Sequence, residues 1–349
     1  MEEALIEEMV EEILLRLPPD DPPSLVRAAM VCRRWRRIIS DPGFRRRFGR
    51  CHSAAPVLGL LANLRDGDGL DDDFDFVARF VPTTPFRPYF PDNRDRCALD
   101  ARHGRVLLTM APLPPALGDP FSWNAAVLCA GHDACSHFDC HLGPFFVVLL
   151  DSNTEQMRVH LYSSEAEASQ PTYGPPSPLD GVETLPTALV GNSLFFLIYA
   201  SQSILEYDLA TRNMSVIPLP PEQYVDFAVL MAMEEDGRLG FARLANSTLF
   251  IWSMERSPEG HAGWALIAAI DLETLLPVDV FSISEDYVGF AHGVGVFFVP
   301  MLEERLIFSI DLYSGRVRVE DCSDGRTHGV VPYTSFYTPD FRQYSVAPV

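Results

Sequence analysis

The chain has 349 residues, of which 47% are hydrophobic, and no apolar run is long enough to predict a transmembrane helix. Seven cysteines do not form the even framework of a small disulfide-rich secreted domain, and the first segment is acidic, unlike a secretory signal. We therefore expect a soluble globular protein of the cytoplasm or nucleus.

Charge is distributed unevenly along the chain. The formal net charge is -21, and residues 1–50 carry 10 Arg against 9 acidic residues, which leaves 17 Arg against 39 acidic residues, or -22, for residues 51–349. A surface with such an excess of carboxylates repels phosphate backbones. We therefore expect protein partners, and neither nucleic acid nor a membrane.

Residues 5–17 have the pattern of an amphipathic helix, because apolar residues recur every four positions in two rows and glutamates lie opposite them. The rows are Leu5, Met9, Ile13 and Leu17, and beside them Ile6, Val10 and Leu14. The prolines of residues 18–23 cannot donate backbone hydrogen bonds to a continuing helix, so the chain must turn there. Ser24 is placed to cap a second helix that begins near Leu25.

A third helix is predicted around Trp35, where arginines lie mostly on one face and apolar residues on the other. The apolar face is Val31, Cys32, Trp35, Ile38 and Ile39. Asp41-Pro42-Gly43 is expected to end this run. Three short helices within residues 1–50 bury little apolar surface, so this module is marginal alone and its apolar faces need a partner.

The strings EEILLRLPP and VCRRWRRIISDPGF are similar to the F-box signature. This resemblance implies that the helices dock on a small Skp-type adaptor, which links the chain to a cullin-RING ubiquitin ligase. It also implies that eight residues either contact the adaptor or support the contacting surface: Leu5, Ile13, Leu14, Leu17, Pro18, Val31, Cys32 and Trp35. The chain departs from the signature at Ile6, where proline is usual, and in a longer loop at residues 20–23. The alternative is that these apolar residues pack only on the rest of the same chain.

Beyond residue 50, short apolar runs such as PFFVVLL, SLFFLIYA and TLFIWSM are separated by turn residues and predict strands. Three further runs end in an Asp-Leu pair, at Asp208, Asp271 and Asp311, each followed by Thr or Ser and an expected return strand. An Asp side chain accepts hydrogen bonds from nearby backbone N–H groups in a tight turn. The uneven spacing of these pairs fits propeller blades with insertions.

This pattern resembles the kelch-like, F-box-associated repeat region that follows the F-box in many plant proteins, and the resemblance covers most of residues 51–349. We predict an α+β multidomain chain, with a three-helix F-box module at residues 1–50 and an all-β propeller-like domain of about six or seven blades at residues 51–349. The segment APLPPALGDPFSW, after RHGRVLLTM, is expected to make one blade short or irregular.

A closed propeller leaves few free edges and carries variable loops on a rigid frame. Residues 79–90 and 333–344 combine the aromatic residues and arginines typical of interface anchors. The alternative is that their aromatic rings fill the blade cores. The substrate-binding residues therefore stay unassigned.

One loop between two predicted strands, CAGHDACSHFDCH, is rich in thiols and imidazoles. It holds six possible zinc ligands, where four would suffice: Cys129, His132, Cys135, His137, Cys140 and His141. The candidate set is Cys129, Cys135, His137 and His141. His137 and His141 form a His-x3-His pair, but no Cys-x2-Cys pair accompanies them and the usual long separation between ligand pairs is missing. We expect these side chains to pack without a metal or another cofactor, and zinc is the alternative.

The sequence contains no phosphate-binding loop, nucleophile elbow, metalloprotease motif or dinucleotide fingerprint, which argues against an enzyme. We expect the substrate-recognition subunit of a Skp/cullin/F-box ubiquitin ligase, with the adaptor on the helices and a protein substrate on the propeller. Two alternatives stay open: a nucleic-acid-binding protein that uses the Arg-rich helix, and a propeller that binds its ligand without an adaptor. All 27 basic residues are arginine, so this receptor offers no lysine to its own ligase.

Overall fold

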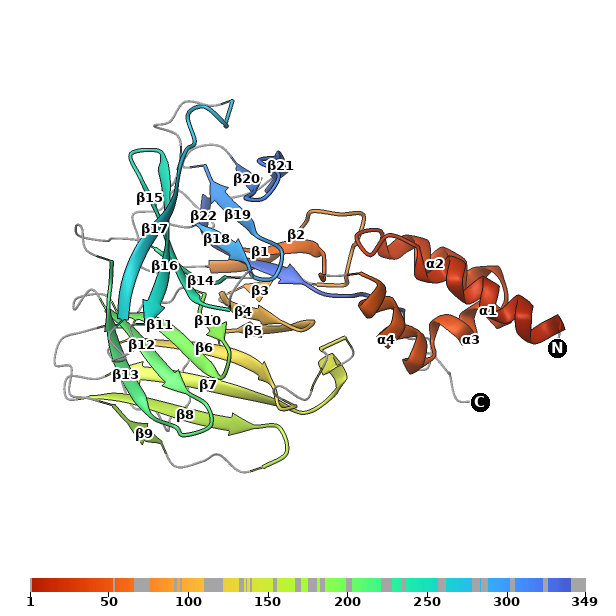
Figure 1. Cartoon of the computed structure of the whole chain (residues 1–349), viewed down its shortest axis with the longest axis horizontal. Coiled ribbons are helices and arrows are strands. Elements are labelled where there is room, and N and C mark those ends of the chain that lie inside the picture. Colours follow the sequence, from red (N-terminus) through yellow and green to blue (C-terminus); the bar gives the residue numbers. More distant parts are fainter. Residues whose placement is uncertain are drawn as a thin grey trace.

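In the computed structural model, four helices project from one side of a β-propeller (Figure 1). The side chains of residues 2–6 are not described. The structure describes residues 2–52, 54–65, 76–90, 93–94, 96–109, 122–131, 135, 137–138, 140–152, 156–166, 171–174, 181–182, 186–198, 203–220, 228–233, 237–256, 262–277, 283, 288–301, 305–322 and 326–339.

Residues 2–51 form four helices, so the prediction of three is wrong. They are α1 (Glu2–Leu15), α2 (Pro22–Val31), α3 (Arg33–Ile39) and α4 (Pro42–Cys51). Asp41-Pro42-Gly43 was expected to end the helical run, and α3 does end at Ile39, but the same residues also begin α4. The Asp41 carboxylate accepts hydrogen bonds from the N–H groups of Gly43 at 2.7 Å and Phe44 at 3.2 Å. Pro42 lies in the first turn, where its missing N–H has no helical partner to lose.

The second and third helices also differ from the prediction at their first residues. Because α2 begins at Pro22, Ser24 lies inside its first turn and donates its hydroxyl to the Asp21 carboxylate instead of capping the helix. Cys32 is extended and separates α2 from α3, and its sulfur accepts a hydrogen bond from the Trp35 N–H at 3.5 Å. The thiol thus takes the capping role that a hydroxyl usually fills.

The helical module has a small core of its own, with members from all four helices. They are Leu14, Leu15, Leu25, Ala28, Ala29, Ile38, Ile39, Phe44 and Phe48. Phe336, which follows the last strand, packs against this core with its ring centroid 6.4 Å from that of Phe48. The helical module therefore contacts the C-terminal segment as well as being linked to the propeller through residues 52–56.

The propeller consists of antiparallel sheets, and the strands of each sheet follow in hydrogen-bonding order. The first contains β22 (Arg326–Thr334), β1 (Val57–Arg65), β2 (Phe76–Pro82) and β3 (Asn93–Arg94). A two-stranded sheet contains β4 (Ala98–Arg102) and β5 (Arg105–Leu108). The next contains β6 (Ser122–Cys129), β7 (Phe145–Ser152), β8 (Met157–Ser163) and β9 (Thr172–Tyr173).

Three more four-stranded sheets complete the propeller. One contains β10 (Ala188–Val190), β11 (Ser193–Ile198), β12 (Ser203–Asp208) and β13 (Met214–Pro218). The next contains β14 (Val229–Ala232), β15 (Leu239–Ala245), β16 (Thr248–Arg256) and β17 (Ala262–Asp271). The last contains β18 (Gly289–Ala291), β19 (Val296–Pro300), β20 (Leu306–Asp311) and β21 (Val317–Asp321).

The predicted number of blades is wrong, because the described residues form five four-stranded blades and not six or seven. The two-stranded sheet of β4 and β5 lies between the first two blades in chain order. Residues 111–120, which follow it, contain four prolines, and proline cannot donate a ladder hydrogen bond. Residues 111–121 of the segment that was expected to make one blade short or irregular lie outside the described part of the chain, so that expectation stays a prediction.

The last strand closes the propeller. β22 pairs antiparallel with β1, which places Pro332 opposite Leu60 and Val331 opposite Leu61. This pairing uses the strand edge that β1 would otherwise leave open. The C-terminal strand and the first strand thus belong to one blade.

Two of the predicted Asp-Leu turns join hairpin strands. Between β12 and β13, the Asp208 carboxylate accepts hydrogen bonds from the N–H of Thr211 at 2.6 Å and from its hydroxyl at 2.8 Å. Between β20 and β21, the Asp311 carboxylate accepts from the N–H groups of Tyr313 and Ser314, both at 2.9 Å. The side chain of each aspartate therefore stabilises its turn as expected.

The third Asp-Leu pair lies at a different place in its blade. Asp271 ends β17, which is the outer strand of its sheet and pairs with β16. No return strand follows it within the described residues 272–277, and residues 278–282 lie outside the described part of the chain. Leu272 and Leu276 follow Asp271 and are buried in the core between this blade and the next. Burial of these leucines directs the chain out of the blade.

Candidate functional site

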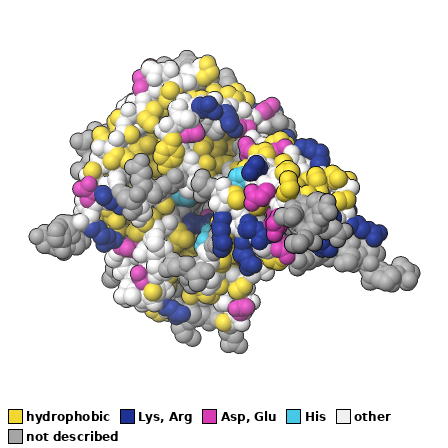
Figure 2. Space-filling model, turned by 45° about the vertical axis from the view of Figure 1, so that its right-hand side comes forward, with side chains coloured by type: hydrophobic (Ala, Val, Ile, Leu, Met, Phe, Trp, Pro, Cys, Tyr) yellow, Lys and Arg dark blue, Asp and Glu magenta, His cyan; other side chains and the backbone are white. Residues whose placement is uncertain are grey.

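Large apolar side chains are exposed on the helical module. Met9 and Ile13 of α1 are 66% and 59% exposed, and Met30 and Val31 of α2 are 69% and 65% exposed. Hydrophobic side chains appear on the surface of this module in Figure 2. Exposed apolar residues that gather on one module mark an interaction site more often than scattered ones do. We call these four residues the apolar helix set.

The predicted adaptor-binding residues separate into two groups. The exposed group is Ile13, Pro18, Val31 and Cys32. The group in or against the core of the module is Leu14, Leu17 and Trp35. Leu5 lies in α1, but its side chain is outside the described residues. The first group is available for contact, and the second group supports the helices.

Met9 and Met30 were not among the predicted contact residues. Two apolar rows run along α1, and Val10 and Leu14 of the second row face the core. Met9 and Ile13 of the first row, one turn apart, face solvent. The period of the pattern identifies the rows but does not determine which of them packs inside.

Arginines of α3 and α4 are paired with glutamates of α1. Arg37 donates to the Glu7 carboxylate at 2.9 Å, and Arg34 lies 3.8 Å from the same group. The Nε of Arg47 donates to Glu11 at 2.7 Å. These exposed pairs add little stability, but they neutralise part of the positive charge that the nucleic-acid alternative requires.

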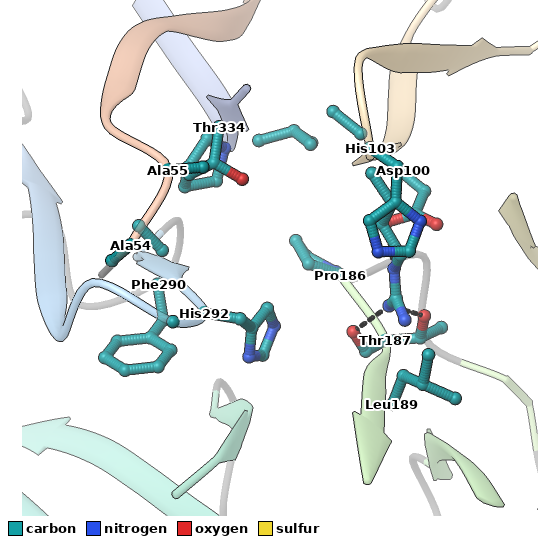
Figure 3. A pocket seen from close by; sticks show the side chains of 16 residues that line it. Ala54, Ala55, Asp100, His103, Pro186, Thr187, Leu189, Phe290, His292 and Thr334 are labelled. Carbon is teal, nitrogen blue, oxygen red and sulfur yellow. Dashed lines mark hydrogen bonds and ion pairs between the residues drawn. The ribbon is translucent and has the colours of Figure 1, made fainter. Parts of the chain in front are cut away.

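A pocket of about 350 Å³ lies at the centre of the propeller, and the link between α4 and β1 forms part of its wall. Figure 3 shows Ala54 and Ala55 of that link on one side, and His103 and Asp100 on the other. Histidine side chains are visible in the hollow beside the helical module in Figure 2. The pocket therefore lies on the side of the propeller that carries the helices.

The charged groups of this pocket are bound to the protein itself. The Asp100 carboxylate accepts from Arg102 Nε at 3.0 Å and from the Val127 N–H at 2.8 Å. Arg102 also donates to the carbonyl and, at 2.6 Å, the hydroxyl oxygen of Thr187, as Figure 3 shows. Burial raises the pKa of Asp100, and Arg102 opposes that shift. These bonds connect the two-stranded sheet to β6 and to the segment before β10.

Two histidines on opposite sides of the pocket are held neutral. Burial, assisted by the charge of Arg102, lowers the pKa of His292 to about 3. Burial also lowers the pKa of His103 to about 3, with contributions from His137 and the neighbouring arginines. A base with so low a pKa is unprotonated throughout the physiological range.

The two aromatic segments that were considered for substrate binding pack on each other. Phe86 stacks on Tyr333 with ring centroids 6.4 Å apart and lies 5.0 Å from Tyr337. Phe80 contacts Phe86 and Tyr333 at 6.0 and 5.9 Å. Tyr89 differs, since it is 97% exposed. Most of the described rings therefore serve the fold, and residues 340–344 lie outside the described part of the chain.

Residues 129–141, which we call the Cys/His loop, bring together four side chains of types that can bind a metal. The sulfurs of Cys129, Cys135 and Cys140 and a ring nitrogen of His137 all lie within 4.8 Å of one another. His141 was the fourth member of the candidate set, but Cys140, another of the six possible ligands of this loop, lies with the other three. The His-x3-His spacing led to His141, whereas the separation of His137 and Cys140 by two residues was the signal for the observed set. His141 packs beside Gly104.

A known protein family matches the sequence of the helical module. Residues 4–47 match the F-box domain family. Over 310 residues the chain is 24% identical to F-box protein At5g07610 of Arabidopsis thaliana, an alignment that covers 77% of this chain and 71% of that protein.

Two solved structures align with most of this chain at low similarity. A chain of a nidogen/laminin complex is 10% identical with a TM-score of 0.38, over 80% of this chain and 99% of that chain. The PQQ-bound aldose sugar dehydrogenase of Streptomyces coelicolor is 11% identical with a TM-score of 0.37, over 81% of this chain and 91% of that chain.

Among the helices of the described residues, none has both the length and the apolar character needed to cross a membrane. The helices and the family match coincide, since α1 to α4 span residues 2–51 and the match spans residues 4–47. The chain therefore carries an F-box domain at residues 4–47, and a propeller-like domain follows it.

Proposed function

We propose that this protein is the substrate-recognition subunit of a Skp/cullin/F-box type ubiquitin ligase. One observation carries the proposal: residues that match the F-box domain family leave the apolar helix set exposed. Burial of such side chains against a partner is worth about 1.5–3 kcal/mol each. The adaptor would cover Met9, Ile13, Met30 and Val31, whereas Leu14, Leu17 and Trp35 hold the helices in place.

In this proposal the chain itself is not catalytic. The propeller holds a protein substrate near the ubiquitin-loaded enzyme of the complex, and the gain in rate comes from proximity. Asp100 and Arg102, which line the central pocket, bond to each other, and Arg102 also bonds to Thr187. Because these charged groups already have partners within the fold, the pocket fits a binding role better than a catalytic one. The similarity to an Arabidopsis protein supports a plant origin. The proposal includes a kelch-like type of propeller and a complex in the cytoplasm or nucleus.

The test is co-purification of the full chain with a Skp-type adaptor, followed by measurement of the dissociation constant. Ile13→Asp and Val31→Asp change exposed side chains, so the fold should tolerate them, but each would bury a carboxylate at the interface. We expect each variant to weaken binding about 100-fold or more. Ile267→Asp is the matched control, because Ile267 is 51% exposed on β17 of the propeller.

A stable complex of one adaptor with one chain, lost in both helix variants and kept in the control, supports the proposal. A well-behaved chain that does not bind the adaptor contradicts it and leaves a propeller that acts alone. Binding of DNA or RNA by residues 1–50 with a steep salt dependence would favour the nucleic-acid alternative.

A further inference from the structure

Four described side chains of the Cys/His loop lie close enough together to hold one metal ion. His137 Nδ1 and Cys140 Sγ are 3.6 Å apart. A tetrahedral zinc ion with ordinary Zn–S and Zn–N bond lengths places a sulfur and a nitrogen ligand about 3.5 Å from each other. We infer that Cys129, Cys135, His137 and Cys140 bind one zinc ion, independently of the ligase role.

The donor set identifies the type of metal and the type of site. Three thiolates and one imidazole are the soft and borderline ligands that select zinc over calcium or magnesium. Four protein ligands fill a tetrahedron and leave no open position, which is the arrangement of a structural site and not of a catalytic one. The ligands lie within residues 129–140, at the end of β6 and in the 3-10 helix Cys140–Leu142, so the ion would close a compact loop.

Neighbouring donors face the sulfurs. The N–H of Gly131 donates to Cys129 Sγ at 3.3 Å, and the N–H of His137 donates to Cys135 Sγ at 3.4 Å. The guanidinium of Arg105 lies 4.0 Å from Cys140 Sγ, and it also donates to the backbone carbonyls of Cys140 and Gly143. Hydrogen bonds from such outer groups stabilise negatively charged ligands and fix their orientation.

The backbone and ring of His137 are also held in place. Its φ of 57° lies in the left-handed region, which is unfavourable for a residue other than glycine unless its surroundings require it. The ring stacks on that of His103 with centroids 3.8 Å apart and planes 4° from parallel. A coordinated metal would offset the backbone cost and explain why a histidine occupies this position.

The loop that the zinc would organise reaches the F-box domain. Phe138 follows His137, and its ring lies against Gly49 of α4 and 5.5 Å from the ring of Phe336. Phe336 in turn packs on the helical core. The zinc ion would therefore fix the surface on which the F-box domain rests.

The experiment measures zinc in the purified full chain, produced with added zinc and without chelators. We expect one zinc per folded chain for the wild type, and a loss of nearly all zinc in Cys135→Ser and Cys140→Ser. His141→Ala and Cys97→Ser are the matched controls, since neither residue belongs to the cluster, and both should keep full zinc content. Replacement of zinc by cobalt in the wild type should produce the visible bands of a tetrahedral site with thiolate-to-cobalt charge transfer.

The cobalt spectrum keeps the inference testable if the cysteine variants fail to fold. Folded wild-type protein without bound zinc or a tetrahedral cobalt spectrum would overturn it. An intact mass lower by two hydrogens, as a disulfide within the loop would cause, overturns it as well. Loss of zinc in His141→Ala with full zinc content in Cys140→Ser would also contradict the proposed ligand set, because it would assign the fourth position to His141.

Discussion

His292 shows how one partly buried base links the fold to pH. Its Nδ1 accepts a hydrogen bond from the N–H of Ala232 at 3.2 Å, so the folded state uses the neutral ring. Across the pocket lie Arg102, which opposes a second positive charge, His103, and Asp100, whose carboxylate is bound to Arg102. Protonation of His292 is therefore unfavourable in the folded protein, so a fall in pH favours the unfolded state.

The sign of the pH dependence follows from the pKa of His292, which is about 3 in the folded chain and about 6.5 in the unfolded chain. Between these values the unfolded state binds the proton, so stability is full above pH 6.5 and falls as the pH decreases. At pH 5.5 this histidine should remove about 1.4 kcal/mol of unfolding free energy. Measured between pH 7.5 and 5.5, the stability of the wild type should fall more steeply than that of His292→Gln.

His292→Gln keeps an uncharged acceptor for the Ala232 N–H, so it serves as the control for the hydrogen bond. His103 is present in both proteins and contributes the same background slope. Parallel stability curves for the two proteins would show that His292 does not carry the pH dependence assigned to it.

At the scale of elements, the contact between α4 and the Cys/His loop determines how the F-box domain meets the propeller. Gly49 of α4 leaves room for the ring of Phe138, and an added Cβ would lie 2.3 Å from a ring carbon. Glycine inside a helix is about 1 kcal/mol less favourable than alanine. The close contact explains why glycine occupies this position despite that cost.

Gly49→Ala tests this contact. The helix gains up to about 1 kcal/mol, but overpacking against Phe138 costs about 1–3 kcal/mol, so we expect a net loss of unfolding free energy in denaturant titrations of the full chain. Gly263→Ala is the matched control, because its nearest neighbour would be 3.9 Å away, and it should change stability little. A Gly49→Ala variant as stable as the wild type would mean that Phe138 does not press on α4.

Phe138→Ala provides a second test of the same contact. If the added Cβ at residue 49 is overpacked against Phe138, truncation of Phe138 should reduce the loss of unfolding free energy that Gly49→Ala causes. The double-mutant cycle should then show coupling between the two sites. Additive effects would show that the two residues do not interact.

Elements with a clear hydrophobic pattern could be predicted from the sequence, and elements that depend on contacts between distant parts of the chain could not. The apolar runs in β7, β11 and β16 predicted strands because their residues are buried by neighbouring blades. Asp41-Pro42 was misinterpreted because the same residues that end one helix can cap and start the next. The pairing of β22 with β1 joins opposite ends of the domain, so no local pattern indicates it.

The candidate sites show the same division. F-box residues were identified from a local signature, but the exposure of Met9 and Met30 depends on how α1 and α2 pack on α3 and α4. Cys140 replaced His141 in the metal-binding set because the 3-10 helix turns one side chain toward Cys129 and directs the next toward Gly104. Spacing alone does not determine which of two adjacent residues faces inward.

For the whole molecule, the composition of the charged residues bears on the proposed ligase role. The chain carries its excess of negative charge on the propeller, and it supplies every positive side chain as arginine. A ligase modifies amines within reach, and a guanidinium group stays protonated and is a poor nucleophile. In the proposed ligase role, a receptor of this composition would therefore be protected chemically from its own complex, whatever its substrate is.

In a reconstituted ligase that contains the chain and its adaptor, ubiquitin conjugation to the chain should be confined to the terminal amine and should nearly vanish when that amine is blocked. Arg46→Lys on α4 and Arg318→Lys on β21 keep the charge at exposed positions. Since only the lysine amine reacts readily, at least one variant should raise conjugation about tenfold or more, read as modified chain by mass spectrometry. Equal conjugation of the blocked wild type and both variants would show that the missing lysines do not protect the receptor.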